Sequence, residues 1–288
     1  MIPVAFDYVA PATLDEALLQ LNQNPDEARI LAGGHSLIPA MKLRLAQPQM
    51  LIDIGRIKEL AYIREADGQI QIGAMTTHQQ IEASERLKQI CPLLPECASH
   101  IGDVQVRNKG TIGGSLAHAD PAADWPAAII ALSAQLVVIG GGGERMIKAD
   151  DFFTNMFTTA LRPGEILREV RIGVSPAKTG QAYTKMHHPA SGFAVVGVAA
   201  SLTLNPDGSC QSANIGITGV GPNAYRAVAA QEGLIGNNLD HETIAAAAAH
   251  VCDDVDANAD LFASAEYRRH LAQVYAARAI AAAAERAK

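Results

Sequence analysis

Apolar positions near the N-terminus follow two different spacings. Over residues 14–21 they recur every three to four positions, which predicts an amphipathic helix. The mostly apolar stretches at residues 29–32 and 50–54 are instead typical of short buried strands. One helix and two strands of this length predict a small α/β unit over residues 1–56.

The segment between these two strands begins with a glycine pair, Gly33-Gly34, and continues as a short helix. Ser36 is placed to cap this helix by accepting a hydrogen bond from a backbone N–H group of its first turn. The apolar face of the helix is predicted to carry Leu37, Met41 and Leu45. The glycine pair is therefore expected at the point where a strand turns into a helix.

A second unit is predicted over residues 57–177. Alternating apolar side chains indicate strands, and the consecutive glycines at 140–143 mark the turn of a hairpin. Thr77 is placed to cap the first of two helices. The predicted elements are a strand at 69–74, helices at 78–86 and 93–101, a hairpin at 135–148 and a strand at 166–174.

The last unit is predicted over residues 178–288, with strands followed by helices. Apolar runs at 182–186, 193–204 and 212–220 indicate three strands, the last two joined by an Asn-Pro-Asp-Gly turn. The final helix is rich in alanine, which favours helix formation. Its apolar stripe is predicted to consist of Tyr267, Leu271, Val274, Ala277 and Ala281.

Composition and charge narrow the class of protein. Of the 288 residues, 49% are hydrophobic and 18% are charged, so the chain is expected to fold into globular domains. The formal net charge is -7 and no dense run of lysine and arginine occurs, which argues against a nucleic-acid partner. No apolar stretch is long enough to span a bilayer, and the N-terminus does not resemble a signal peptide. We therefore expect a cytoplasmic protein without a transmembrane segment.

Cysteine and histidine do not form a recognisable metal motif in this sequence. The cysteines are too far apart and too irregularly spaced for a zinc or iron–sulfur motif, and we expect reduced thiols. The side chains of His187 and His188 would diverge on a strand, which makes joint ligation of one metal ion unfavourable. The four cysteines are Cys91, Cys97, Cys210 and Cys252.

No residue of this chain is predicted to be catalytic. His118 and Asp120 could in principle form a proton-transfer pair, but a spacing of two residues does not bring an imidazole and a carboxylate together. A loop fixed by Pro121 is the better interpretation of this segment.

Two glycine pairs carry the strongest chemical signal. A diphosphate needs several backbone N–H groups that point to one place, and glycine allows the close approach and the positive φ angles of such a cup. The first pair, Gly33-Gly34, precedes His35 and Ser36, and the second, Gly113-Gly114, lies within residues 111–115. Both segments are therefore expected to direct N–H groups and a hydroxyl at an anion.

Either pair alone is equally well explained as a tight turn. Neither matches the GxGxxG fingerprint of a Rossmann dinucleotide site, and neither has the GK[ST] ending of a triphosphate-binding loop. The presence of two such segments favours a phosphate site of another kind.

The strings around both glycine pairs resemble the two FAD-binding motifs of the medium, flavin-carrying subunit of molybdenum hydroxylases. They are AGGHSLIPAMKLRLAQPQMLIDI and QVRNKGTIGGSLAHADPAADWPAAIIAL. This family includes the carbon monoxide dehydrogenase type and the flavin domain of xanthine dehydrogenases, and the resemblance covers essentially the whole chain. It implies an α+β chain with a vanillyl-alcohol-oxidase-type (PCMH-like) FAD-binding fold. Such a chain has two α/β subdomains with FAD between them, and a C-terminal domain with a three-stranded antiparallel sheet and a helical bundle.

The resemblance also implies which residues contact FAD. Its first motif places the diphosphate contacts on Ala32, Gly33, Gly34, His35 and Ser36, with Leu37 continuing the loop. Its second motif places contacts on Thr111, Gly113, Gly114 and Ser115, and Ile101 resembles a position that packs against the cofactor.

Four single residues extend this set by resemblance. Asp124 resembles a carboxylate near the adenosine end of FAD, with a helix cap as the alternative. Leu161 resembles a leucine whose backbone approaches the adenine or ribitol, with a loop-anchoring core residue as the alternative. Lys185 resembles a lysine that stabilises charge on the reduced flavin, with a solvated strand-edge lysine as the alternative. Phe193 stands where relatives often have tyrosine or tryptophan; it can stack on the flavin but offers no hydrogen bond.

The function implied by the resemblance is electron transfer. This chain would carry FAD, while a small iron–sulfur subunit and a large molybdopterin subunit would carry the [2Fe-2S] clusters and the molybdenum, in a dimer of heterotrimers. Electrons would pass from the partner's clusters to FAD and on to an external acceptor, and substrate would be hydroxylated on the large subunit. The substrate stays open, as does the acceptor, which could be NAD, a quinone, a cytochrome or oxygen.

Two other functions remain compatible with the sequence. A freestanding flavin-dependent oxidase or reductase of the same fold would need a substrate chamber with acid–base groups beside its own ring. A non-enzymatic assembly module would use the glycine segments as turns, or to bind another phosphate ligand.

Overall fold

The N-terminal sheet has three parallel strands in the computed structural model, which describes residues 1–288. Its order is β1-β3-β2, with β1 at Asp7–Val9, β2 at Ala28–Leu31 and β3 at Met50–Asp53. Helix α1, Leu14–Gln23, begins after Thr13, whose side chain accepts a hydrogen bond from the Glu16 N–H group. Its buried side chains join the core beneath the sheet. The helix and both strands predicted here are confirmed.

Helix α2, Leu37–Lys42, begins and ends differently from the prediction. Ser36 has helical backbone angles (φ -105°, ψ -50°) and its side chain makes no cap hydrogen bond, so the predicted serine cap is wrong. Met41 is buried as expected, but Leu45 is 80% exposed because the chain leaves the helix at Arg44, where φ is 60°. The Ser36 hydroxyl is thus not used to start the helix.

The second sheet has five antiparallel strands in the order β4-β5-β10-β6-β7. The predicted strands and hairpin are confirmed. Strand β4 and the separate pair β8 and β9 were not predicted, because strands this short show no period. The strands are β4 (Ile63–Ala66), β5 (Gln69–Gly73), β6 (Gln135–Gly140), β7 (Gly143–Lys148), β8 (Phe153–Asn155), β9 (Thr158–Thr159) and β10 (Ile166–Gly173).

Short helices pack against this sheet and form the largest core with it. The helix predicted at 78–86 is two helices, because Ser84 starts a second one by accepting a hydrogen bond from the Leu87 N–H group. Thr77 caps the first helix, as predicted, in a capping box with Gln80. The helices are η1 (Lys58–Leu60), α3 (His78–Glu82), α4 (Glu85–Ile90), α5 (Leu93–Ser99), α6 (Val104–Lys109), α7 (Ile112–His118), α8 (Trp125–Ala131) and α9 (Ala149–Phe152).

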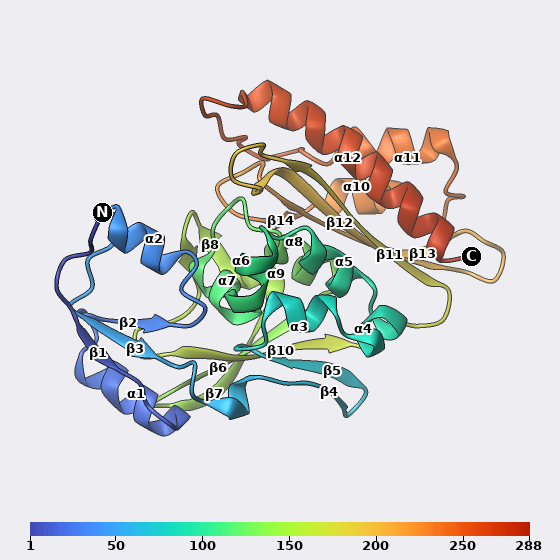
Figure 1. Cartoon of the computed structure of the whole chain (residues 1–288). Helices are drawn as coiled ribbons and strands as arrows, with labels where there is room; N and C mark the ends of the chain where they lie inside the picture. The colour runs from blue at the N-terminus through green and yellow to red at the C-terminus, as the bar shows by residue number, and fades with distance from the viewer.

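The C-terminal sheet has four antiparallel strands, one more than the three predicted. The additional strand, β14 at Tyr225–Arg226, has only two residues and therefore leaves no pattern in the sequence. Figure 1 shows this sheet with α10, α11 and α12 over one face and α8 on the other side. The remaining elements are β11 (Thr179–His187), β12 (Ala194–Leu204), β13 (Cys210–Thr218), α10 (Val228–Leu234), α11 (His241–Ala248) and α12 (Ala265–Arg286).

The buried face of α12 matches the predicted stripe only in part: Leu271 is buried and Ala277 packs against the core. Tyr267 is 41% exposed and Ala281 is also exposed. Alanine occurs on every side of this helix, so the sequence pattern does not mark a single face. The side chains that pack into the core with the sheet are Leu271, Ala272, Ala276, Ala279, Ile280, Ala283 and Ala284.

Cysteines and adjacent histidines are placed as the sequence predicted. All four cysteines are buried free thiols. The His187 ring contacts His100 whereas the His188 ring packs against Phe262, so the two neighbouring side chains diverge. No helix has both the length and the apolar character that crossing a membrane requires.

Candidate cofactor-binding site

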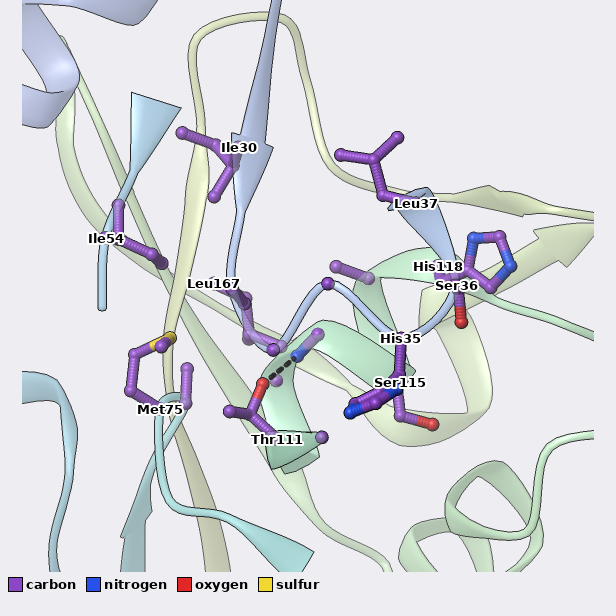
Figure 2. Close-up of a pocket in the computed structure, with 18 of the residues that line it drawn as sticks. Ile30, His35, Ser36, Leu37, Ile54, Met75, Thr111, Ser115, His118 and Leu167 are labelled. Atoms are coloured by element: carbon purple, nitrogen blue, oxygen red, sulfur yellow. Dashed lines mark hydrogen bonds between the residues drawn. The ribbon is translucent and has the colours of Figure 1, made fainter. Parts of the chain in front are cut away.

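A cavity of about 510 Å³ lies between the N-terminal sheet, the helices of the second sheet and the loop at 191–193 that precedes β12. Both glycine segments border it, and every residue predicted to contact a cofactor lines it except Lys185. The two ends differ in character, as Figure 2 shows. Ile30, Ile54, Met75 and Leu167 line an apolar end, and His35, Ser36, Ser115 and His118 gather at a polar one.

The first glycine segment presents a row of free backbone donors. None of the N–H groups of residues 32–37 donates to a backbone carbonyl of the chain. Gly34 has a φ of +76°, a left-handed value that glycine adopts without strain and that turns the chain at this point. Unpaired N–H groups beside a cavity need acceptors from a ligand or from water. A diphosphate, whose oxygens only accept hydrogen bonds, fits this donor set.

The first glycine segment packs closely against the main chain directly before the second one. A Cβ atom on Gly33 would lie 2.3 Å from the carbonyl oxygen of Lys109 and 2.7 Å from the Cα atom of Gly110. A Cβ atom on Gly114 would lie 3.3 Å from the Cβ atom of Ala32. Only glycine at position 33 therefore allows the two segments to approach this closely.

The second glycine segment uses its N–H groups inside the protein, contrary to the expectation that both segments offer them to an anion. The Gly113 N–H group donates to the Ala74 carbonyl at 2.9 Å, and the Gly114 N–H group donates to Thr111 Oγ1 at 3.1 Å. A Cβ atom on Gly113 would lie 2.4 Å from that of Ala74, so this glycine is needed for packing. The segment's Ser115 side chain faces the cavity. Donors for an anion therefore come mainly from residues 32–37.

Lys185 does not line the cavity but lies behind it. Its side chain is fully buried, with Nζ 2.8 Å from Asp124 Oδ1 and 2.9 Å from the His100 carbonyl oxygen. The alternative of a solvated strand-edge lysine is therefore wrong. Tyr183 donates its hydroxyl to Asp124 at 2.6 Å, so this carboxylate is held by two side chains from β11.

Asp124 borders the cavity, yet its oxygens already accept hydrogen bonds from the protein. It occupies the position before α8 but makes no cap hydrogen bond, so the alternative of a helix cap is wrong. Burial raises the pKa of its carboxyl, while Lys185 and Tyr183 act in the opposite direction. Burial also raises the pKa of Tyr183 well above its ordinary value, which keeps the hydroxyl as a donor. The direct ligand role of Asp124 stays a prediction.

Three apolar residues complete the predicted set. Ile101 and Leu161 are partly buried, pack against the largest core and also line the cavity. Leu161 thus fits both interpretations offered by the sequence. Phe193, from the loop before β12, is 41% exposed and also borders the cavity.

Several cavity residues were missed by sequence reasoning. The apolar end is lined by side chains at strand ends, which the sequence cannot distinguish from ordinary core positions. His78 was also missed, although it directly follows the predicted cap Thr77. His78 is 4% exposed, and its Nδ1 atom accepts a hydrogen bond from Trp125 Nε1 at 3.0 Å. Burial, together with the nearby charges of His35 and Arg107, lowers the pKa of His78 to about 4.

This buried imidazole is expected to make the protein acid-sensitive. A folded-state pKa of about 4, below the ordinary histidine pKa of 6.5, means that the unfolded chain binds the additional proton between these two pH values. The free energy of unfolding should therefore fall by about 3 kcal/mol as the pH drops from 6.5 to 4, since one pKa unit corresponds to about 1.4 kcal/mol. Urea unfolding of wild type and His78→Gln across this range measures the difference. Equal pH dependence in both proteins would contradict this assignment.

Comparison with known proteins agrees with the cavity and the fold. Residues 4–175 match the family described as "FAD binding domain in molybdopterin dehydrogenase", and residues 181–283 match "CO dehydrogenase flavoprotein C-terminal domain". The chain is 40% identical to the carbon monoxide dehydrogenase medium chain of Hydrogenophaga pseudoflava, over 98% of each chain. It is 37% identical to the alpha subunit of the 6-hydroxypseudooxynicotine dehydrogenase complex of Paenarthrobacter nicotinovorans, over 100% of this chain and 97% of that one.

A solved structure of carbon monoxide dehydrogenase from Hydrogenophaga pseudoflava gives the same result in three dimensions. It superposes with a TM-score of 0.96 over 99% of both chains, at 41% sequence identity. The resemblance read from the two motifs and the fold that it implied are confirmed, apart from the additional strand of the C-terminal sheet. The chain belongs to the FAD-binding medium subunits of the molybdenum hydroxylases, the family that includes the carbon monoxide dehydrogenase medium chains.

Proposed function

We propose that this chain works as the FAD-carrying electron-transfer subunit of a molybdenum hydroxylase. The observation that carries this proposal is the row of unpaired N–H groups at residues 32–37, which faces a large cavity in a chain of a FAD-binding family. Bound FAD supplies the redox chemistry, because a flavin exchanges electrons singly or in pairs. The residues of the chain bind the cofactor, orient it and set the polarity around it.

We assign the three parts of FAD to three parts of the cavity. Its diphosphate would accept hydrogen bonds from residues 32–36, with the hydroxyls of Ser36, Thr111 and Ser115 nearby. Its adenosine would lie at the apolar end, whose aliphatic side chains suit a flat aromatic base. Its flavin ring would lie beside Ile101 and Phe193, with Leu161 toward the ribitol and the Asp124 and Lys185 pair behind the ring. Because Asp124 is paired with Lys185, it would lie at the flavin end rather than at the adenosine end that the resemblance implied.

We further propose that the chain assembles with partners that carry the other redox centres. These are a small subunit with [2Fe-2S] clusters and a large molybdopterin subunit, arranged as a dimer of heterotrimers. Support comes from the relatives, whose names describe a medium chain and a subunit of a complex. Electrons would enter FAD from the clusters and leave to an external acceptor. Copurification followed by sequencing of the bound proteins tests this assembly.

The division of the chain and its cellular location are also proposals. We propose three units at residues 1–56, 57–177 and 178–288, supported by a separate main sheet in each. Limited proteolysis of the purified protein tests these boundaries. Four buried thiols without a disulfide are typical of a reducing compartment, so we propose a cytoplasmic location, which cell fractionation tests.

The purified chain is expected to contain FAD or to take it up. Flavin absorbance in the folded protein, and quenching of flavin fluorescence when FAD is added to cofactor-free protein, measure this directly. Free phosphate at high concentration should compete weakly, because it offers the same acceptor oxygens without the rest of the cofactor. A folded chain that neither contains nor binds FAD would refute the proposal.

A freestanding flavin oxidase would need acid–base groups at the ring end of the cavity. The carboxylate that we place beside the ring, Asp124, is already held by Lys185 and Tyr183. We therefore expect the FAD-loaded chain alone to oxidise none of the substrates that the assembled enzyme oxidises. Turnover by the isolated chain would favour the freestanding function instead.

A further inference from the structure

His78 lies at the start of α3, against Gly110, the residue directly before the second glycine segment. A Cβ atom on Gly110 would lie 2.6 Å from His78 Nε2, and Gly110 itself contacts Gly33. The His78 side chain is buried among protein atoms, yet it lines the cavity. Gly110 therefore links this imidazole to the segment that carries the free N–H groups.

The hydrogen bond from Trp125 fixes which nitrogen of His78 carries the proton. The indole Nε1–H group can only donate, so Nδ1 of His78 must be the acceptor. A buried neutral imidazole with Nδ1 as acceptor carries its hydrogen on Nε2. The structure thus presents Nε2–H as a donor whose tautomer is set by Trp125.

The Nε2–H group has no acceptor within the chain. Gly110 lies next to it, but the Gly110 carbonyl accepts from the backbone N–H group of His78 rather than from its ring. Nε2 is also not fully enclosed by protein atoms. Among the fully enclosed side-chain nitrogens and oxygens, only Arg268 Nε lacks a hydrogen-bond partner, so Nε2, which also lacks one, must be accessible. A donor in such a place needs an acceptor from the contents of the cavity.

We propose that His78 Nε2–H donates a hydrogen bond to a diphosphate oxygen of bound FAD, and that Trp125 is the positioning residue that fixes the required tautomer. This inference rests on the proposed function, and it adds a side-chain donor to the backbone donors of residues 32–37. A phosphate oxygen is favoured over a ribityl hydroxyl because His78 lies against Gly110, and Gly110 in turn contacts Gly33 in the segment that carries the free backbone donors. A donor-only group matches an acceptor-only oxygen.

The test measures FAD affinity and the environment of its two phosphorus atoms in the full chain. His78→Phe keeps a flat ring but removes the donor, and FAD should bind roughly 10- to 100-fold more weakly, the usual effect of losing a hydrogen bond to a charged group. His78→Gln restores an N–H group at a similar reach and should recover most of the affinity. Ile81→Ala, a buried change on the same helix away from the cavity, is the control and should leave FAD affinity unchanged.

Spectroscopic measurements separate a direct contact from a structural effect. The 31P resonances of bound FAD should differ between wild type and His78→Gln, because the donor to the phosphate changes. In 15N-histidine-labelled wild type, His78 should show the Nε2–H tautomer, and this proton should move downfield when FAD binds. Trp125→Phe should lose that fixed tautomer and weaken FAD binding, but it should have little effect in a His78→Phe background.

Two results would overturn this inference but leave the proposed function unaffected. One is a His78→Phe chain that folds and binds FAD as tightly as wild type. The other, which applies even if this variant does not fold, is a wild-type Nε2–H signal that FAD leaves unmoved. A wild-type chain that binds no FAD overturns the proposed function as well, so the two failures are distinguishable.

Discussion

Replacing Gly33 with alanine is expected to separate the two glycine segments and to weaken FAD binding roughly 5- to 150-fold. The added Cβ atom would lie 2.3 Å from the Lys109 carbonyl oxygen, so the backbone on one side must move. Overpacking of this kind costs about 1–3 kcal/mol, which gives that range of affinity when the strain falls on the FAD-bound state. Fluorescence titration of cofactor-free protein with FAD measures the change.

Gly142→Ala is the matched control for this substitution. Gly142 lies at the turn of the hairpin of β6 and β7, and a Cβ atom there would meet nothing within 4 Å. This variant should bind FAD as the wild type does. Equal FAD affinity in Gly33→Ala and Gly142→Ala would show that the contact between the two segments does not shape the anion site.

Replacing Lys185 with methionine is expected to destabilise the fold by about 3–5 kcal/mol, the usual effect of removing one partner of a buried ion pair. Both side chains of the pair are nearly inaccessible, with 0% and 5% exposure for Lys185 and Asp124. The substitution leaves a buried carboxylate and also releases the His100 carbonyl, next to the cavity residue Ile101. Urea unfolding of the cofactor-free chain measures the loss of stability separately from FAD binding.

The loss of stability caused by Lys185→Met should be smaller at low pH. Without Lys185, the folded-state pKa of Asp124 rises further above that of the unfolded chain, so the folded form binds the proton more tightly and lowering the pH favours it. The double variant Asp124→Asn with Lys185→Met should recover part of the stability for the same reason. Lys88→Met is the control, since Lys88 and Glu85 are 47% and 79% exposed and such pairs contribute at most about 1 kcal/mol. If Lys185→Met lowered the free energy of unfolding as little as Lys88→Met does, this result would contradict a buried ion pair.

Sequence patterns predicted the elements that have a clear period or a clear cap. The strand at Gln69–Gly73 alternates, Thr77 starts a helix, and the consecutive glycines turn a hairpin, all through local interactions. The patterns failed where the deciding contacts are distant in sequence. The two-residue strand β14 exists only because β13 lies beside it, and the buried side of α12 is chosen by the sheet rather than by its alanines.

The cavity could be located from the sequence because each of its two glycine segments is an unbroken stretch of the chain. Their different use of N–H groups could not be predicted, since the Gly113 N–H group donates to Ala74 on a separate segment of the chain. Lys185 was expected beside the cofactor, but its position behind Asp124 depends on how β11 packs against the start of α8. His78 carries no motif of its own, and its significance appears only beside Trp125 and Gly110.

Main-chain atoms alone meet where Gly33 contacts residues 109 and 110. Bond lengths and van der Waals radii of the main chain are the same in every protein, so substitutions of side chains elsewhere leave the spacing at this contact unchanged. The spacing of the chain at this contact therefore depends on the glycine at position 33 and not on the identity of the side chains around it.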